Sequence, residues 1–317
     1  MHYDVFNGDA DGIIALVQLR LAQPKQAKPI TGVKRDIKLL KQVPKDAHSV
    51  TVLDISMETN KEALVRLLEN GVKVFYVDHH RSGDIPDNSL LKAIVDTDAN
   101  TCTSLLVNHY LNGRFAHWAV AAAYGDNMLA SAEKLAQQLE LSDTEKAQLK
   151  ALGIYINYNG YGRTVDDLHI APAKLFELLV NYENPLDLIA EQDSVFYQLE
   201  RAYQSDMQQA DNAKVLVDND VCKMVQLPDE KWARRVSGVF GNELANRAPK
   251  KAHAVFTVNE DGSYTVSLRA PLVNKQGAGD ICVQFPTGGG REAAAGINQL
   301  PAQMIEQFIK SVSQYYS

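Results

Sequence analysis

The fold is decided by Tyr3-Asp4-Val5-Phe6-Asn7-Gly8-Asp9-Ala10-Asp11-Gly12, in which a short apolar strand leads directly into two carboxylates and a glycine. The same arrangement recurs twice. Ser49-Val50-Thr51-Val52-Leu53 is followed by Asp54, and the strand-like segment 72–77 is followed by Asp78-His79-His80. Strands of such continuous apolar character are typical of a buried, mostly parallel sheet with helices on both faces. Because the carboxyl ends of parallel strands lie along one edge, we expect the three acidic groups to meet there.

The rest of the chain divides into a helical region and a second, smaller α/β region. Helical spacing is clear at 13–21 and 60–70, a fourth strand is expected at 90–95, and residues 101–211 are nearly all helical in pattern. The C-terminal region begins with strand patterns, and Asn259-Glu260-Asp261-Gly262-Ser263 predicts a hairpin turn. The expected C-terminal elements are strands at 214–217, 221–226, 254–258 and 264–268 and helices at 232–246 and 301–315. We therefore predict an α/β protein with a first domain at 1–190, a helical connector at 191–213 and a smaller α/β domain at 214–317.

Composition narrows the class of protein. The chain has 317 residues, 45% of them hydrophobic, and a net charge of −7. Its apolar runs are too short to span a bilayer and its first residues do not resemble a cleaved signal, so we expect a cytoplasmic protein without a membrane partner. The three cysteines form no Cys-x-x-Cys pair, which favours buried free thiols over disulfides or a thiolate zinc site. They are Cys102, Cys222 and Cys282.

The acidic residues indicate a cation site. Their excess lies before Lys214, which does not suit a protein that coats long nucleic acid. Asp-x-Asp-Gly alone is common in turns, and Asp54 alone could cap a helix. Three acidic groups at three strand ends are harder to explain by turn chemistry, because neighbouring carboxylates repel unless a cation compensates them. Carboxylates together with imidazole suit Mn²⁺ or a similar divalent ion.

These motifs carry a family resemblance. Asp9-Ala10-Asp11-Gly12, Asp54, Asp78-His79-His80 and Gly125-Asp126-Asn127 resemble, in order, the four motifs of the DHH phosphoesterase superfamily. In the C-terminal region, Thr287-Gly288-Gly289-Gly290 with Ala294-Ala295-Gly296 is similar to the glycine signature of the DHH-associated domain, and Ser267-Leu268-Arg269 resembles its substrate-contacting strand. Ile156-Asn157 with Gly162-Arg163 is similar to a segment of the RecJ-like exonucleases. The resemblance covers almost the whole chain.

The resemblance implies a DHH domain at 1–190, a substrate-binding domain at 214–317, and two divalent ions, with Mn²⁺ favoured and Mg²⁺ or Co²⁺ as alternatives. Asp54 would bridge the two ions and is one of two residues with an implied catalytic role. The other is His80, which would contact the scissile phosphate, while Asp78 would orient the His79 imidazole. The remaining implied ligands are Asp11, His79 and Asp126 on one ion and Asp9 on the other. Two ions held this way stabilise in-line displacement at phosphorus.

The sequence departs from the family pattern at two places. Val5 and Asn7 stand where many members carry a histidine or a further aspartate, so Asn7 or water would complete one ion's ligands. Arg291 stands where a histidine often follows the glycines, and it keeps a hydrogen-bond donor there. A glycine triplet alone is also typical of a flexible turn, and Arg163 could equally be an exposed arginine at a helix end. The predicted substrate-binding residues are Arg163, Arg269, Gly288, Gly289, Gly290 and Arg291.

The function that these observations favour is hydrolysis of very short linear oligonucleotides to mononucleotides by a metal-dependent phosphodiesterase, with linear dinucleotides such as pGpG or pApA as substrates. Two alternatives stay open: phosphatase action on 3′-phosphoadenosine 5′-phosphate, and a non-catalytic nucleotide-binding sensor. A single-stranded DNA exonuclease is disfavoured because the acidic chain offers little basic track for a long strand. The expected partner is a short oligonucleotide or dinucleotide rather than long duplex nucleic acid or a membrane, with a homodimer as a candidate assembly.

Overall fold

The computed structural model describes residues 1–317, which divide into two compact units, Met1–Ala202 and Tyr203–Ser317. The division falls inside helix α9 (Val195–Ala210), within the range 191–213 that the sequence assigns to a helical connector. No helix in the chain combines the length and the apolar character needed to cross a membrane. All three cysteines are buried and free, as predicted.

The first unit is built on a five-stranded sheet in which every neighbouring pair is parallel, in the order β2-β1-β3-β4-β5. Its strands are β1 (His2–Phe6), β2 (Lys28–Ile30), β3 (Ser49–Leu53), β4 (Lys73–Asp78) and β5 (Leu91–Val95). This confirms the predicted parallel α/β sheet, and β2 is the strand that the sequence did not predict. Pro29 lies within it and lacks a backbone N–H, which restricts a strand to the edge of a sheet, where β2 lies.

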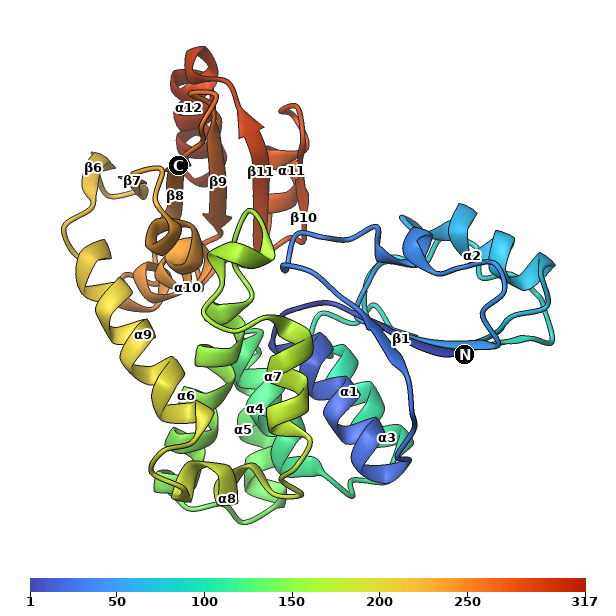
Figure 1. The fold of residues 1–317 in the computed structure, drawn as a ribbon. Coiled ribbons are helices and arrows are strands. Elements are labelled where there is room, and N and C mark those ends of the chain that lie inside the picture. The colour runs from blue at the N-terminus through green and yellow to red at the C-terminus, as the bar shows by residue number, and fades with distance from the viewer. The chain divides into compact units, whose positions relative to one another are not determined.

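Successive side chains along a strand point to opposite faces of this sheet, and both faces are buried. Val5 packs in a cluster with Val52, Tyr76 and residues of α2 (Lys61–Glu69), such as Leu67. The next residue, Phe6, points to the opposite face, where its ring lies 6.1 Å from that of Phe176 on α7 (Pro172–Leu179). Helix α1 (Ala10–Ala22) packs against α3 (Thr103–Tyr110), α4 (Ala116–Gly125) and α7, as Figure 1 shows.

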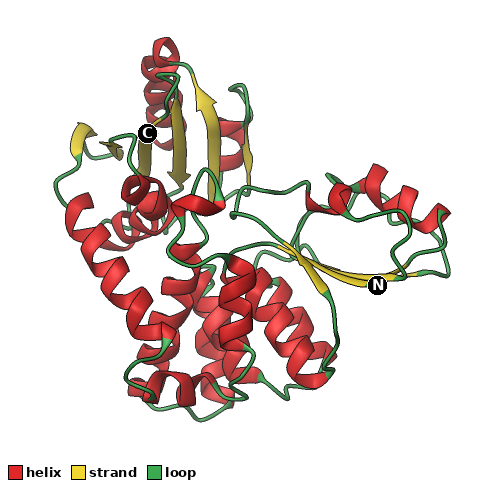
Figure 2. Ribbon diagram, viewed as in Figure 1, coloured by secondary structure: helices red, strands yellow, loops and turns green.

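The helical region that follows the sheet contains no strand between residues 103 and 202, which confirms the sequence prediction (Figure 2). Besides α3, α4 and α7 it contains α5 (Leu129–Gln138), α6 (Asp143–Asn159), α8 (Pro185–Ala190) and the first part of α9. Helix α6 packs along α4 and begins with a capping box between Ser142 and Glu145. Its C-terminal end, at Asn159, leads back toward the sheet edge, where the acidic residues lie.

The second unit has a six-stranded mixed sheet in the order β10-β11-β9-β8-β7-β6, in which only β7 and β8 are parallel. A cluster of apolar side chains, including Phe256 and Phe308, joins the sheet to its C-terminal helix. The predicted hairpin between β8 and β9 is present, whereas the sequence did not predict β10, β11 or α11. The strands are β6 (Lys214–Asp218), β7 (Cys222–Leu227), β8 (Ala252–Val258), β9 (Tyr264–Arg269), β10 (Gly288–Gly290) and β11 (Ala294–Leu300), and the helices are α10 (Lys231–Arg247), α11 (Ala278–Cys282) and α12 (Ile305–Tyr316).

Candidate active site

The acidic groups lie side by side at the carboxyl edge of the parallel sheet. Beyond the last strand residues the backbone pairing continues, because the Asn7 N–H donates to the Leu53 carbonyl at 3.2 Å and the Asp54 N–H donates to the Val77 carbonyl at 3.1 Å. Neighbouring strands are about 4.8 Å apart. The register therefore brings Asn7, Asp54 and Asp78 to neighbouring positions, as the sequence pattern predicts.

His79 presents one ring nitrogen to two of these carboxylates. Its Nδ1 lies 3.0 Å from the Thr101 carbonyl, which can only accept, so Nδ1 carries a proton and Nε2 is the nitrogen that a neutral imidazole offers to a metal ion. Nε2 lies 3.4 Å from Asp54 Oδ1 and 3.7 Å from Asp11 Oδ2. Ligands bound to one divalent ion at about 2.1 Å lie roughly 3.0–3.4 Å apart. The His79–Asp54 distance fits two ligands of one divalent cation, and Asp11 lies 0.3 Å beyond that range.

Asp11 is held by the start of α3. The Thr103 N–H donates to its Oδ2 and the Ser104 N–H donates to its Oδ1, both at 2.7 Å. The Thr103 hydroxyl also donates to Asp54 Oδ1 at 3.2 Å. Each carboxylate oxygen keeps a second lone pair, so these bonds fix the side chain and still leave it able to bind a cation. The sequence analysis gave Thr103 and Ser104 no role; the only available signal was a Thr-Cys-Thr-Ser segment ahead of a helical pattern.

His80 is oriented by Asp78, which corrects the expectation that Asp78 orients His79. Asp78 Oδ1 lies 2.8 Å from His80 Nδ1, and His79 instead uses the Thr101 carbonyl. The strand ends at Asp78 and the chain bends at His79 and His80, so that both rings lie beside Asp54 Oδ1, His79 Nε2 at 3.4 Å and His80 Nδ1 at 3.8 Å. His80 is 37% exposed whereas Asp78 is fully buried. Burial alone lowers the pKa of His80, but the hydrogen bond to Asp78 and the charge of Asp54 raise it overall.

Asp54 occupies an unfavourable environment in two respects. Its backbone adopts a φ of 59°, in the left-handed region that few residues other than glycine, asparagine and aspartate visit. Burial and the negative charges of Asp9 and Asp11 raise the pKa of its carboxyl well above the ordinary value. Strain and like-charge repulsion at one buried residue are typical of a functional position. His80 joins Asp54 and His79 in a group whose ligand atoms all lie within 4.8 Å of one another.

The other predicted ligands, Asp9 and Asp126, surround a lysine that the sequence analysis did not identify. Lys34 Nζ lies 2.6 Å from Asp9 Oδ2, 3.0 Å from Asn157 Oδ1 and 3.4 Å from Asp126 Oδ1. Burial alone lowers the pKa of Lys34, but the carboxylates of Asp9 and Asp126 raise it well above its ordinary value. The side chain is therefore a charged ammonium.

Asn7 joins the loop that carries Lys34 to the loop that carries Asp9. Its Nδ2 donates to the Lys34 carbonyl at 3.1 Å, and its Oδ1 accepts from the Asp9 N–H at 3.2 Å. Both polar atoms of the Asn7 amide thus bind backbone groups of these loops. The Asn7 Oδ1 keeps a second lone pair, and the completion of an ion's ligands by Asn7 or water stays a prediction.

Arg163 lies near this part of the site but on the surface. It follows α6 in an exposed loop, where its backbone N–H donates to Asp167 Oδ2 at 2.8 Å. Tyr161, two residues earlier, places its ring 5.5 Å from Lys34 Nζ. The Arg163 loop therefore lies beside the Lys34 loop, and a role in substrate binding stays a prediction.

The substrate-binding residues predicted in the second unit gather at one end of its sheet. Arg269, the last residue of β9, pairs with Ala294, the first residue of β11, and the Arg291 N–H donates to the Ala294 carbonyl at 3.0 Å. The Arg269 guanidinium donates to Asn242 Oδ1 at 2.5 Å and to the Gly238 carbonyl at 3.1 Å, both on α10. These bonds fix its orientation. The glycines 288–290 form the edge strand β10 beside β11 rather than a loop.

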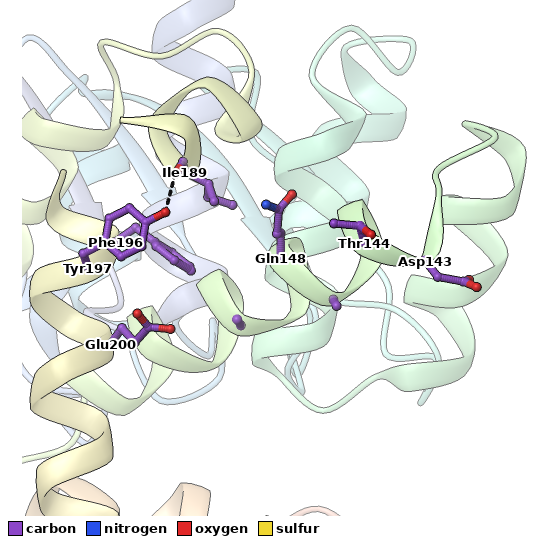
Figure 3. A pocket seen from close by; sticks show the side chains of 9 residues that line it. Asp143, Thr144, Gln148, Ile189, Phe196, Tyr197 and Glu200 are labelled. Atoms are coloured by element: carbon purple, nitrogen blue, oxygen red, sulfur yellow. Dashed lines mark hydrogen bonds between the residues drawn. The ribbon is translucent and has the colours of Figure 1, made fainter. Parts of the chain in front are cut away.

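A shallow groove elsewhere in the first unit does not suit an anionic substrate. It lies between α6, α8 and α9, where the Tyr197 hydroxyl donates to the Ile189 carbonyl at 3.0 Å (Figure 3). Its lining includes the carboxylates of Asp143 and Glu200 and no lysine, arginine or histidine. A phosphate group would meet only negative or neutral side chains there.

Comparison with known proteins agrees with this fold. No protein-family model and no curated protein sequence matches the chain. Among solved structures, a DHH-domain protein described as a member of a family of ribosomal proteins has a TM-score of 0.62 at 14% identity, over 99% of this chain and 86% of its own. Exonuclease RecJ bound to manganese follows with a TM-score of 0.59 at 17% identity, over 99% of this chain and 89% of its own. The pGpG-specific phosphodiesterase PggH from Vibrio cholerae has a TM-score of 0.57 at 13% identity, over 99% of this chain and 98% of its own.

These similarities establish the fold: the chain has the same architecture as the DHH-domain protein, RecJ and the pGpG-specific phosphodiesterase. The resemblance drawn from the order of its motifs is confirmed at that level.

Proposed function

We propose that this protein is a divalent-cation-dependent phosphodiesterase that hydrolyses very short linear oligonucleotides, with linear dinucleotides such as pGpG or pApA as its substrates. The observation that carries the proposal is the position of His79 Nε2. This nitrogen lies 3.4 Å from Asp54 Oδ1 and 3.7 Å from Asp11 Oδ2. Two carboxylates with an imidazole nitrogen, all buried, suit a divalent ion such as Mn²⁺. The fold shared with a pGpG-specific phosphodiesterase and with RecJ supports the same class of reaction.

The residues of this site have separable roles in the proposal. Asp11, Asp54 and His79 would hold the ion, which when bound acts as a Lewis acid on a phosphoryl oxygen. His80, partly exposed and held by Asp78, is placed to hydrogen-bond the substrate phosphate or supply a proton to the leaving oxygen. Manganese is the ion we expect. The resemblance implies two ions, but Asp9, assigned to the second ion, and Asp126, assigned to the first with Asp11 and His79, both contact the ammonium of Lys34.

The test is a panel of labelled linear oligonucleotides of two to six residues, incubated with purified protein and Mn²⁺. We expect the dinucleotides to be cleaved fastest, no cleavage in EDTA, and no cleavage by Asp54→Asn in either condition. Asp84→Asn is the matched control, because this aspartate is fully exposed in the same unit. Binding without any product would instead indicate the nucleotide sensor. Release of phosphate from 3′-phosphoadenosine 5′-phosphate without oligonucleotide cleavage would indicate the phosphatase.

A further inference from the structure

The loop that carries Lys34 is fixed to the sheet edge by hydrogen bonds of both the N–H and the carbonyl of Lys34. The Lys34 N–H donates to the Gly160 carbonyl at 2.8 Å, and the Lys34 carbonyl accepts from Asn7 Nδ2 at 3.1 Å. Gly8 permits this approach, since a Cβ there would lie 1.9 Å from the Gly32 carbonyl oxygen. The loop therefore has a defined place against the residues that follow β1.

The three oxygens around Lys34 Nζ match the three donors of an ammonium. They come from Asp9, Asp126 and Asn157, which belong to three separate parts of the unit: the start of α1, the end of α4 and the last turn of α6. Lys34 is 24% exposed, and the two carboxylates are almost fully buried. Three convergent acceptors at 2.6–3.4 Å form a built site for one compact cation.

A divalent ion bound to Asp9 would compete with this ammonium. Asp9 Oδ1 caps helix α1 by accepting from the Gly12 N–H at 3.1 Å. Asp9 Oδ2 is therefore the oxygen more available to a metal ion, and it is the oxygen that Lys34 contacts. An ion bonded to that oxygen at about 2.1 Å would lie near a fixed positive charge. The His79 side of the site is different, because Nε2 there faces two carboxylates with no cation of the chain in contact with it.

We infer that Lys34 takes the place of the second metal ion, so that this centre binds one divalent ion, at Asp11, Asp54 and His79, beside a permanent ammonium at Asp9, Asp126 and Asn157. The inference rests on the metal binding proposed above and departs from the two ions that the family resemblance implies. Lys34 is in this view a positioning residue. It holds Asp9 and Asp126 in place and supplies positive charge at the sheet edge without an exchangeable ion.

The test is a count of bound Mn²⁺ by isothermal titration and by electron paramagnetic resonance on the whole chain. We expect one ion per wild-type chain, with the spectrum of an isolated Mn²⁺. Lys34→Met keeps the length of the side chain and removes its charge, so we expect a second ion to bind. Two ions about 3.5–4 Å apart are magnetically coupled and change the spectrum. Lys38→Met is the control, since this lysine is exposed in the same loop and should leave the count at one.

Each result decides between the alternatives. Two coupled ions in the wild type would overturn the role of Lys34 and leave the proposed phosphodiesterase standing. One ion in both wild type and Lys34→Met would also overturn it, because the lysine would then exclude nothing. No bound ion in the wild type would overturn the metal centre and with it the proposed function. If Lys34→Met does not fold, Lys34→Gln offers the same comparison, and the wild-type count stands in either case.

Discussion

The environment of Asp54 predicts that Asp54→Asn stabilises the metal-free protein. Asparagine has nearly the same shape and tolerates the left-handed backbone found here, so the change removes a charge with little strain. Its side-chain oxygen can still accept the bond from the Thr103 hydroxyl. What is lost is repulsion between Asp54 and the carboxylates around it.

The size of the effect follows from the contacts of His79. Because Asp54 Oδ1 and Asp11 Oδ2 lie 3.4 and 3.7 Å from the same nitrogen, they are at most about 7 Å apart. Two unit charges at that separation repel by about 2 kcal/mol at an effective dielectric constant near 20. For a unit of this size, 2 kcal/mol corresponds to a rise in melting temperature of about 4–8 °C.

The gain should increase with pH. Burial and the neighbouring charges raise the pKa of Asp54 above its ordinary 3.8, so the folded protein binds this proton more tightly than the unfolded chain. The stability of the wild type therefore falls as pH rises from about 4 toward the raised pKa, whereas the variant has no proton to lose at this position. The difference between the two proteins is largest above that pKa.

The assay is thermal unfolding of both proteins followed by circular dichroism, in EDTA and in excess Mn²⁺, across a pH series. In EDTA the variant should melt higher. In Mn²⁺ the order should reverse, since an ion at 100 times its Kd stabilises the wild type by about 2.7 kcal/mol and the variant lacks a ligand. A variant that melts lower than wild type in EDTA at every pH would refute the electrostatic account of Asp54, and Asp84→Asn should match wild type throughout.

Four further substitutions test other parts of the structure. His79→Ala should reduce cation-dependent turnover by more than about 100-fold with an unchanged circular dichroism spectrum, and near-normal activity would contradict its role as a ligand. Gly288→Ala should destabilise the second unit, because a Cβ there would lie 1.8 Å from a backbone oxygen of α11, whereas Gly289→Ala meets nothing within 4 Å and should keep the melting temperature. If the glycines bind an anionic substrate, Gly289→Ala should still raise KM, and an unchanged KM would exclude that role. Arg20→Met removes two charge-assisted bonds to the buried carboxylate of Asp4 and should cost about 3–5 kcal/mol in urea unfolding; a loss below about 1 kcal/mol would show that the pair is replaceable.

The sheet and its acidic edge could be predicted because their signals are local. Each of the predicted strands of the first unit is an apolar run, and each carboxylate group follows its strand directly in sequence. The elements that were not predicted lack such runs. β2 contains Pro29 and only three residues, and β10 consists of three glycines, which predict a turn better than a strand. In both cases the strand forms because a neighbouring strand offers its edge, and a single sequence does not show that partner.

The contacts within the site divide in the same way. The pair Asp78–His80 is local, because its two residues are only two positions apart in the sequence. The carbonyl that orients His79 is 22 residues away, and its position depends on how α3 packs on α1. Lys34 lies 92 residues from Asp126 and 123 from Asn157. No local pattern marks such a lysine, because its role depends on acceptors that only the folded chain brings together.

The position of Lys34 also bears on how this edge of the sheet can fold before it binds an ion. Buried carboxylates that face one another oppose folding, and the raised pKa of Asp54 is the measure of that opposition. The ammonium of Lys34 contacts Asp9 and Asp126 and is part of the chain, so it compensates these two carboxylates at any metal concentration. No lysine or arginine pairs with Asp11 or Asp54, whose carboxylates face His79 and His80 and accept hydrogen bonds from the start of α3. Removal of metal should therefore loosen the α3 side of the site while the Lys34 side stays ordered, a difference that hydrogen exchange at Thr103 and Ser104 would reveal.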